Sequence, residues 1–293
     1  MLQLSSHDKD LGGGFLVRRL LPALQQRAVG PFVFFDHFGP IAAGPDDDHD
    51  VRPHPHIGLA TVTYLFAGAQ VHRDSTGVVQ RIEPGAINWM TAGRGIVHSE
   101  RTPDELRGHE RVSHGLQLWA ALPAEDEELE PSFSHTPAAA IPELRQPGAT
   151  LRVLIGSAFG VASPVPTRSP TLYLDLALEA GAEVELPGEL ATERALYGVD
   201  ELVTVDGEPV PPHRMAVLDA GRSVRLRSEQ AARVVLIGGE PLGPRYMWWN
   251  FVSSRKERIV QAADDWAAQP NGAFPQVPGE RDFIPLPEKR PTV

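Results

Sequence analysis

Two short segments combine imidazole and carboxylate side chains at a spacing that suits a metal ion. His54 and His56 flank Pro55 in RPHPHIGLAT, and His98 and Glu100 stand two residues apart in GRGIVHSE. Residues i and i+2 share one face of a strand, whereas on a helix they point about 200° apart around the axis. Pro55 also pushes His54 towards an extended conformation. Each pair is therefore expected to project from a β strand.

The two pairs together supply three imidazoles and one carboxylate, which is the donor set of an open metal site. The segment between them is long enough for several short strands to bring the pairs together across a small β barrel. Such donors suit Fe(II), Mn, Ni, Cu or Zn and leave positions for water or substrate. The chain has no cysteine, so a thiolate zinc site is excluded. Taken alone, either pair could also be a chance pairing with no role in metal binding.

A third histidine segment, VHRDSTG, has two interpretations. His72, Asp74 and Ser75 either form a hydrogen-bonded network that orients a ligand imidazole or simply make a hairpin turn. The turn is the favoured interpretation. The glycine run in DLGGGFLVRR, residues 12–14, is also interpreted as a turn, because no strand before it or helix after it supports a phosphate loop.

The elements that must position these residues are mainly strands. Abundant Gly and Pro residues separate short runs rich in Val, Leu, Ile, Thr and aromatic residues. Strands are predicted in residues 61–66, 87–90, 116–122, 151–156, 171–178, 214–219 and 232–239. Residues 125–147 are interpreted as a connection without strands between two β units. One amphipathic helix is predicted in RKERIVQAADDWAAQ, with Ser254 and Glu257 as a capping box.

Composition limits the classes of partner. The 27 Lys and Arg residues stand against 38 Asp and Glu residues, which gives a formal charge of −11 and disfavours direct binding to nucleic acid or to anionic membranes. No apolar run approaches the roughly 20 residues that span a bilayer. The first residues do not resemble a signal peptide. A cytoplasmic protein without a membrane role is expected.

The run PHPHIGLATVTYLFAG, followed by HRDSTG and PGAINWMTAGRGIVHSE, resembles the metal-binding half of the pirin family within the cupin superfamily. FFDHFGP upstream and IGGEPLGP downstream match as well, so the resemblance spans nearly the whole chain. It implies an all-β bicupin with a short C-terminal helix. Residues 1–135 would form a metal-binding cupin domain, and residues 136–293 would form a cupin domain without metal that ends in a helix and tail.

The resemblance also implies iron in the N-terminal domain, held by His54, His56, His98 and Glu100. One departure concerns Ile57 and Ala60, because many pirins carry Arg and Glu at these positions. Alanine offers no donor atom, so Glu100 must supply the protein carboxylate, and the pocket beside it is expected to be less polar than in those relatives.

Two functions follow from the resemblance. The first is an iron-dependent dioxygenase of quercetin 2,3-dioxygenase type, with a small aromatic, flavonol-like substrate, O₂, and Glu100 as a catalytic proton acceptor. The second is a redox sensor whose iron alters a surface that binds a regulatory protein. The two hypotheses share one metal site and differ in turnover.

Overall fold

The computed structural model describes residues 1–11, 14–47, 49–269 and 273–291, and strands dominate it. The glycine run at residues 12–14 lies partly outside these ranges. The chain groups into two compact units that are interleaved along the sequence. The first contains Met1–Lys9, Arg18–Asp36 and Thr136–Leu242, and the second contains Asp10–Val17, His37–His135 and Gly243–Val293. Within the described ranges, no helix combines the length and apolar character needed to cross a membrane.

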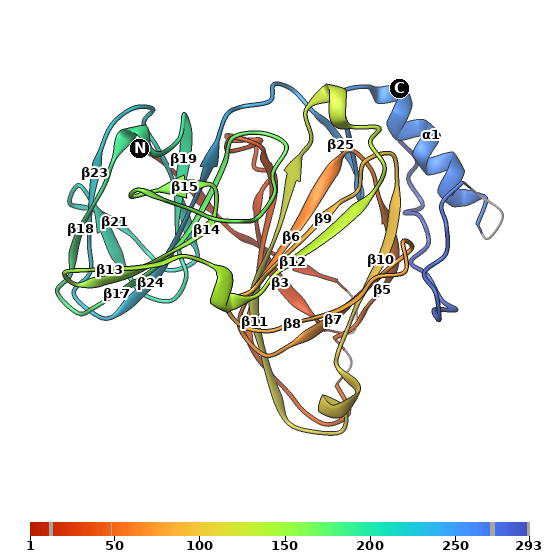
Figure 1. Ribbon diagram of the computed structural model, residues 1–293, viewed down its shortest axis with the longest axis horizontal. Helices are drawn as coiled ribbons and strands as arrows, with labels where there is room; N and C mark the ends of the chain where they lie inside the picture. The colour runs from red at the N-terminus through yellow and green to blue at the C-terminus, as the bar shows by residue number, and fades with distance from the viewer. Residues whose placement is uncertain (12–13, 48, 270–272, 292–293) are drawn as a thin grey trace. The chain divides into compact units, whose positions relative to one another are not determined.

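The first unit is built on two antiparallel sheets (Figure 1). The larger sheet has the order β1 (Leu2–Ser5), β22 (Arg214–Leu218), β19 (Glu193–Gly198), β24 (Ala232–Gly239), β17 (Thr171–Leu178), β14 (Ala149–Ile155) and β13 (Glu143–Gln146). The smaller has the order β18 (Glu183–Leu186), β23 (Val224–Arg227), β20 (Val203–Val205) and β21 (Glu208–Val210), and a hairpin joins β15 (Ser157–Ala158) to β16 (Val161–Ala162). The alternating leucines of β17, Leu172 to Leu178, all enter the apolar core of this unit.

The second unit carries the predicted metal residues. One of its sheets has the order β5 (Val51–His56), β10 (Ile96–Arg101), β7 (Gln70–Asp74) and β8 (Val79–Ile82). Another contains, side by side, β12 (Ser132–Thr136), β9 (Ile87–Thr91), β6 (Leu59–Ala67), β11 (Arg111–Ala121) and β4 (Phe32–Ala43), of which β4 belongs to this unit from His37 onward.

Short elements from both units complete the described fold. They are β2 (His7–Asp10), β3 (Leu16–Leu21) and the 3-10 turns Asp104–Leu106, Ala124–Asp126, Ala138–Ala140 and Gly188–Leu190.

The C-terminal segment joins the second unit. The hairpin of β25 (Tyr246–Trp248) and β26 (Phe251–Ser253) leads into α1 (Lys256–Ala267), which packs beside it (Figure 1). The buried face of α1, with Ile259 and Trp266, meets Ile57 and Val97 in one apolar cluster. The two units are each made of several sequence segments, so they do not test the predicted domain boundary between residues 135 and 136, which stays a prediction.

The all-β prediction with one short C-terminal helix is confirmed, and every predicted strand coincides with an observed one. Two local predictions are wrong. Residues 125–147, predicted to lack strands, contain β12 and β13. These strands were missed because each is short and prolines interrupt the sequence around them. The capping box is absent: the cap residue Arg255 makes no side-chain cap, and Ser254 instead donates its hydroxyl to the buried carboxylate of Glu127 at 3.0 Å.

Candidate metal centre

Two adjacent antiparallel strands bring the predicted histidine segments together. His54 of β5 stands opposite His98 of β10, and His56 stands opposite Ile96. On its other side β10 pairs with β7, where Asp74 faces His98 and His72 faces Glu100. Residues directly opposite one another in an antiparallel pair share a face of the sheet. The alternation predicted from the sequence therefore places these polar side chains on one common face.

The three imidazoles of His54, His56 and His98 converge. Each offers one nitrogen, and these nitrogens all lie within 4.8 Å of one another. The centroids of the rings are 4.4 Å apart for His54 and His98, and 5.0 Å apart for each ring with His56. This is the one such group of three or more candidate ligands found in the described part of the chain.

Hydrogen bonds fix which ring nitrogen of each imidazole is free. His54 donates its Nδ1–H to the carbonyl oxygen of Arg52 at 2.8 Å, and His56 donates its Nδ1–H to the carbonyl oxygen of Asn250 at 3.1 Å. A carbonyl oxygen only accepts, so Nε2 carries the lone pair in both rings. The Nε2 atoms of His56 and His98 are buried and have no hydrogen-bond partner among the described residues. Buried, unpaired nitrogen lone pairs are what a divalent metal ion would satisfy.

Burial keeps these imidazoles neutral. All three side chains are buried, and burial lowers the pKa of His54 to about 4. Burial and the neighbouring imidazoles hold the pKa values of His56 and His98 well below the ordinary value. Because only the neutral imidazole can coordinate a metal, the site is ready to bind at neutral pH without losing protons from these rings.

Glu100 lies on the same face but outside the imidazole group. Its carboxylate is absent from the set of donor atoms within 4.8 Å of one another. The side chain is partly buried, and burial raises its pKa to about 7. The structure thus brings together three of the four predicted ligands and leaves the carboxylate of Glu100 outside that group.

A relay of hydrogen bonds stands behind His98. The Nδ1 atoms of His98 and His72 lie 3.3 Å apart, and Nε2 of His72 lies 2.8 Å from Oδ2 of Asp74. The other oxygen of Asp74 accepts from the amide and hydroxyl of Thr76 at 2.8 and 2.6 Å. Burial favours the neutral acid, but the hydrogen bonds from His72 and Thr76 outweigh it and hold the pKa of Asp74 below its ordinary value.

The relay settles the tautomers in order. The carboxylate of Asp74 accepts, so His72 donates through Nε2–H, and its Nδ1 lone pair accepts the Nδ1–H of His98. The free nitrogen of His98 is therefore Nε2, as in the other two rings. The sequence favoured a simple turn at this segment, whereas the structure contains both the turn, closed on Asp74, and the network.

Aromatic rings border the imidazoles. The ring of Trp119 on β11 lies edge-on to His56 with centroids 5.1 Å apart. Phe133 on β12 stacks on His72 at 4.4 Å with an angle of 21° between the planes. The site therefore combines a polar centre with flat apolar surfaces.

Ile57 does not belong to this face. It packs in the apolar cluster with Phe251 and Ile259, as expected for the neighbour of His56 on an alternating chain. Ile57 therefore adds nothing to the imidazole face, and the expectation of a less polar pocket stays a prediction. Ala60 is completely buried and offers no donor.

Comparison with known proteins identifies the family. Residues 14–120 match the family described as Pirin, and residues 173–272 match the Pirin C-terminal cupin domain. The chain belongs to the pirin family. It is 47% identical to a pirin-like protein of Caulobacter vibrioides, covering 98% of this chain and 99% of that protein. The bicupin fold of the pirin family, expected from the resemblance, is thereby confirmed.

Two further relatives of this pirin family member are named for a dioxygenase. A Pseudomonas aeruginosa protein, provisionally named a quercetin 2,3-dioxygenase, is 39% identical and covers 90% of this chain and 82% of its own length. A crystal structure of quercetin 2,3-dioxygenase from Acinetobacter baumannii is 32% identical, with a TM-score of 0.92, and covers 100% of this chain and 96% of that chain.

Several contributors to the site were missed from the sequence. The carbonyl oxygen of Asn250, which holds His56, comes from a segment almost 200 residues away and carries no side-chain signal. Phe133 lies in a stretch that was interpreted as a connection. The two-residue spacing of His72 and Asp74 was compatible with a hydrogen-bonded network, but the same spacing fits a turn equally well.

Proposed function

We propose that this protein is a metal-dependent dioxygenase that acts on small aromatic, flavonol-like substrates, with iron as its metal. The proposal assigns His54, His56, His98 and Glu100 as the metal ligands. The observation that carries it is the convergence of three neutral imidazoles whose nitrogens lie within 4.8 Å of one another. Among the described residues, Nε2 of His56 and Nε2 of His98 are buried without a hydrogen-bond partner. The names of the Pseudomonas and Acinetobacter relatives support the choice of reaction.

The residues present fit a metal ion of this kind. Neutral imidazoles and a carboxylate are the donors that Fe(II) prefers, and a set of four protein ligands leaves coordination positions open. A redox-active metal, when bound, supplies the electron chemistry that a reaction with O₂ requires. The three Nδ1–H hydrogen bonds would hold the ligand rings in one orientation throughout the reaction.

Glu100 is proposed as the proton acceptor. A carboxyl group with a pKa of about 7 can take up a proton near neutral pH, and the hydroxyl proton of a flavonol is the one that must leave. A bound cation would lower this pKa, so the carboxylate must loosen from the metal when it accepts the proton. Trp119 and Phe133, which border His56 and His72, would contribute aromatic contacts to a flavonol bound beside the imidazoles.

The test is a turnover assay. The purified chain is loaded with Fe(II) without oxygen, mixed with a panel of flavonols, and exposed to O₂ while oxygen uptake and product mass are followed. Many molecules of O₂ consumed per chain, with both oxygen atoms found in the product, are expected. The His98→Ala variant, treated identically, provides the matched control and is expected to be inactive.

A single round of iron oxidation without turnover would contradict the enzyme proposal for those substrates. It would favour the redox-sensor function, in which the same site alters a surface for a regulatory protein. The cytoplasmic location stays a prediction.

A further inference from the structure

The C-terminal tail crosses the outer face of the strands that carry the imidazoles. On β10, His98 and Glu100 share the inner face, so Ser99 and Arg101 point the opposite way. Ser99 is nevertheless completely buried, and the side chain of Arg101 is only 17% exposed. One residue of the tail, Glu280, contacts both side chains.

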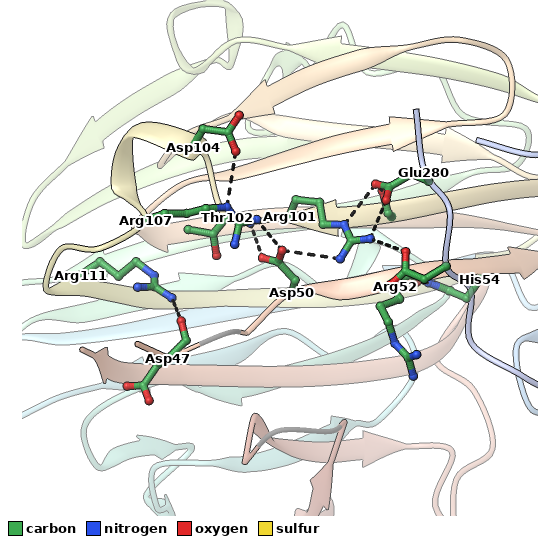
Figure 2. A network of polar contacts seen from close by, with 12 residues as sticks. Asp47, Asp50, Arg52, His54, Arg101, Thr102, Asp104, Arg107, Arg111 and Glu280 are labelled. Atoms are coloured by element: carbon green, nitrogen blue, oxygen red, sulfur yellow. Dashed lines mark hydrogen bonds and ion pairs between the residues drawn. The ribbon is translucent and has the colours of Figure 1, made fainter. Parts of the chain in front are cut away.

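Glu280 binds the outer face of β10 through three hydrogen bonds. Its Oε1 accepts from the hydroxyl of Ser99 at 2.7 Å and from Nε of Arg101 at 3.1 Å, while Oε2 accepts from Nη2 of Arg101 at 2.6 Å. Figure 2 shows the carboxylate facing the edge of the guanidinium, with Asp50 on the other side. Burial favours the neutral acid, but the hydrogen bonds from Arg101 and Ser99 outweigh it and keep the pKa of Glu280 below its ordinary value. A bidentate pair of this kind fixes orientation as well as distance.

Four residues later the same tail binds the neighbouring strand. The amide of Ile284 donates to the carbonyl oxygen of Pro53 at 2.8 Å, directly before His54. The carbonyl oxygen of Ile284 accepts in turn from the indole of Trp266 on α1 at 3.0 Å. The tail therefore connects β10 beside His98 to β5 beside His54 and anchors both to the helix.

The tail contacts β5 and β10 beside an irregularity in the pairing of these two strands. The pairing of β5 with β10 shifts register between His98 and Glu100, so that His98 faces His54 but Glu100 faces Val51. A shift of this kind interrupts the ladder and bends the strand locally. The ladder between β5 and β10 is thus interrupted between the two candidate ligands of β10.

We infer that Glu280 is a positioning residue of the metal centre: by clamping Ser99 and Arg101 from outside, it sets the distance of His98 and Glu100 from the imidazoles of β5. The inference rests on the proposed metal site, but not on any turnover. Glu280 lies beyond both regions matched to the family. It touches no metal itself and acts through the strand.

The test compares three full-length variants with the wild type. Glu280→Gln keeps the shape but removes the charge, and Ser99→Ala removes one donor from the clamp. Asp282→Asn is the matched control, because Asp282 binds the same Arg101 at 3.0 Å but is 47% exposed, whereas the Ser99 hydroxyl donates to Glu280. Binding of Co(II) and its visible absorption spectrum are measured for each, together with thermal unfolding without metal.

We expect Glu280→Gln to bind Co(II) about tenfold more weakly and with altered visible bands, which report the geometry around the ion. Ser99→Ala should change the spectrum in the same direction, and Asp282→Asn should match the wild type. Wild-type affinity and spectrum in both Glu280→Gln and Ser99→Ala would overturn the inference, whatever their unfolding temperatures. A wild-type chain that binds Co(II) but, when loaded with Fe(II), turns over none of the flavonols would contradict only the dioxygenase proposal for those substrates. One that binds no metal would refute both.

Discussion

Replacing His72 by phenylalanine is expected to weaken metal binding while leaving every proposed ligand in the chain. Phenylalanine preserves the ring that stacks on Phe133. It removes the acceptor for Nδ1–H of His98 and the donor to Oδ2 of Asp74. The His98 ring then loses the contact that fixes its tautomer and its orientation, so that Nε2 no longer points reliably towards the other two imidazoles.

The magnitude follows from the hydrogen bonds lost. Removing the partner that orients a metal-binding histidine costs about 10- to 100-fold in affinity, which corresponds to roughly 1.4 to 2.7 kcal/mol. Stability without metal should fall as well, since each of the two buried polar groups left unpaired, on His98 and Asp74, costs about 1 to 3 kcal/mol. Asp74 keeps its hydrogen bonds from Thr76, so the turn itself should survive.

The assay is competition for Zn(II), and for Fe(II) without oxygen, against a chromogenic chelator. Phe133→Leu is the matched control, because it removes the stacked ring but no hydrogen bond, and we expect it to change the affinity less than about threefold, well below the loss from an orienting partner. If His72→Phe bound metal as tightly as the wild type, the relay would have no role in holding His98, and the reasoning from tautomers would be refuted.

Three further predictions concern protons, backbone and catalysis. Burial lowers the pKa of His54 to about 4, and those of the other two imidazoles also fall, so the metal-free folded chain binds fewer protons than the unfolded chain up to about pH 6.5. Its free energy of unfolding should therefore rise between about pH 4 and 6.5 in urea titrations, despite the opposite contributions of the Glu100 and Asp36 carboxyls, whose pKa values burial raises. A flat profile would contradict this. Gly58→Ala should lower the free energy of unfolding by about 3 kcal/mol or more, because Gly58 has a φ of +67° and an added Cβ would lie 2.0 Å from the carbonyl oxygen of Val252. Gly77→Ala is the control: Gly77 has a φ of +93° but open space around it, so the loss should be only about 1 kcal/mol. Equal losses in the two variants would refute the steric argument. Glu100→Gln should reduce turnover at least about 100-fold in the oxygen-uptake assay, and unchanged turnover would exclude Glu100 as the proton acceptor.

The convergence of His54, His56 and His98 was predictable from the sequence because these residues obey strand alternation. A single proline between His54 and His56 was enough to indicate an extended segment, and the i and i+2 spacing then defined the shared face. The helix was predictable for the same reason, since the spacing of Ile259 and Trp266 marks its buried side. These features depend only on neighbours in sequence.

The supporting contacts could not be predicted because they join distant parts of the chain. The carbonyl oxygen of Asn250 and the carboxylate of Glu280 reach the site only once the C-terminal segment packs against β5 and β10. Ser254 is a local prediction that failed for the same reason. Its sequence context predicts a helix cap, but its hydroxyl donates to the buried, distant Glu127 instead. Tertiary contacts overrode the local preference there.

Every function proposed above requires that His54, His56 and His98 hold a metal ion. Elemental analysis of the freshly purified protein, beside His98→Ala purified identically, tests it most directly. We expect about one transition-metal ion per wild-type chain and almost none in the variant. Equal metal content in the two proteins, or a wild-type chain that stays metal-free even after incubation with Fe(II) in the absence of oxygen, would contradict it.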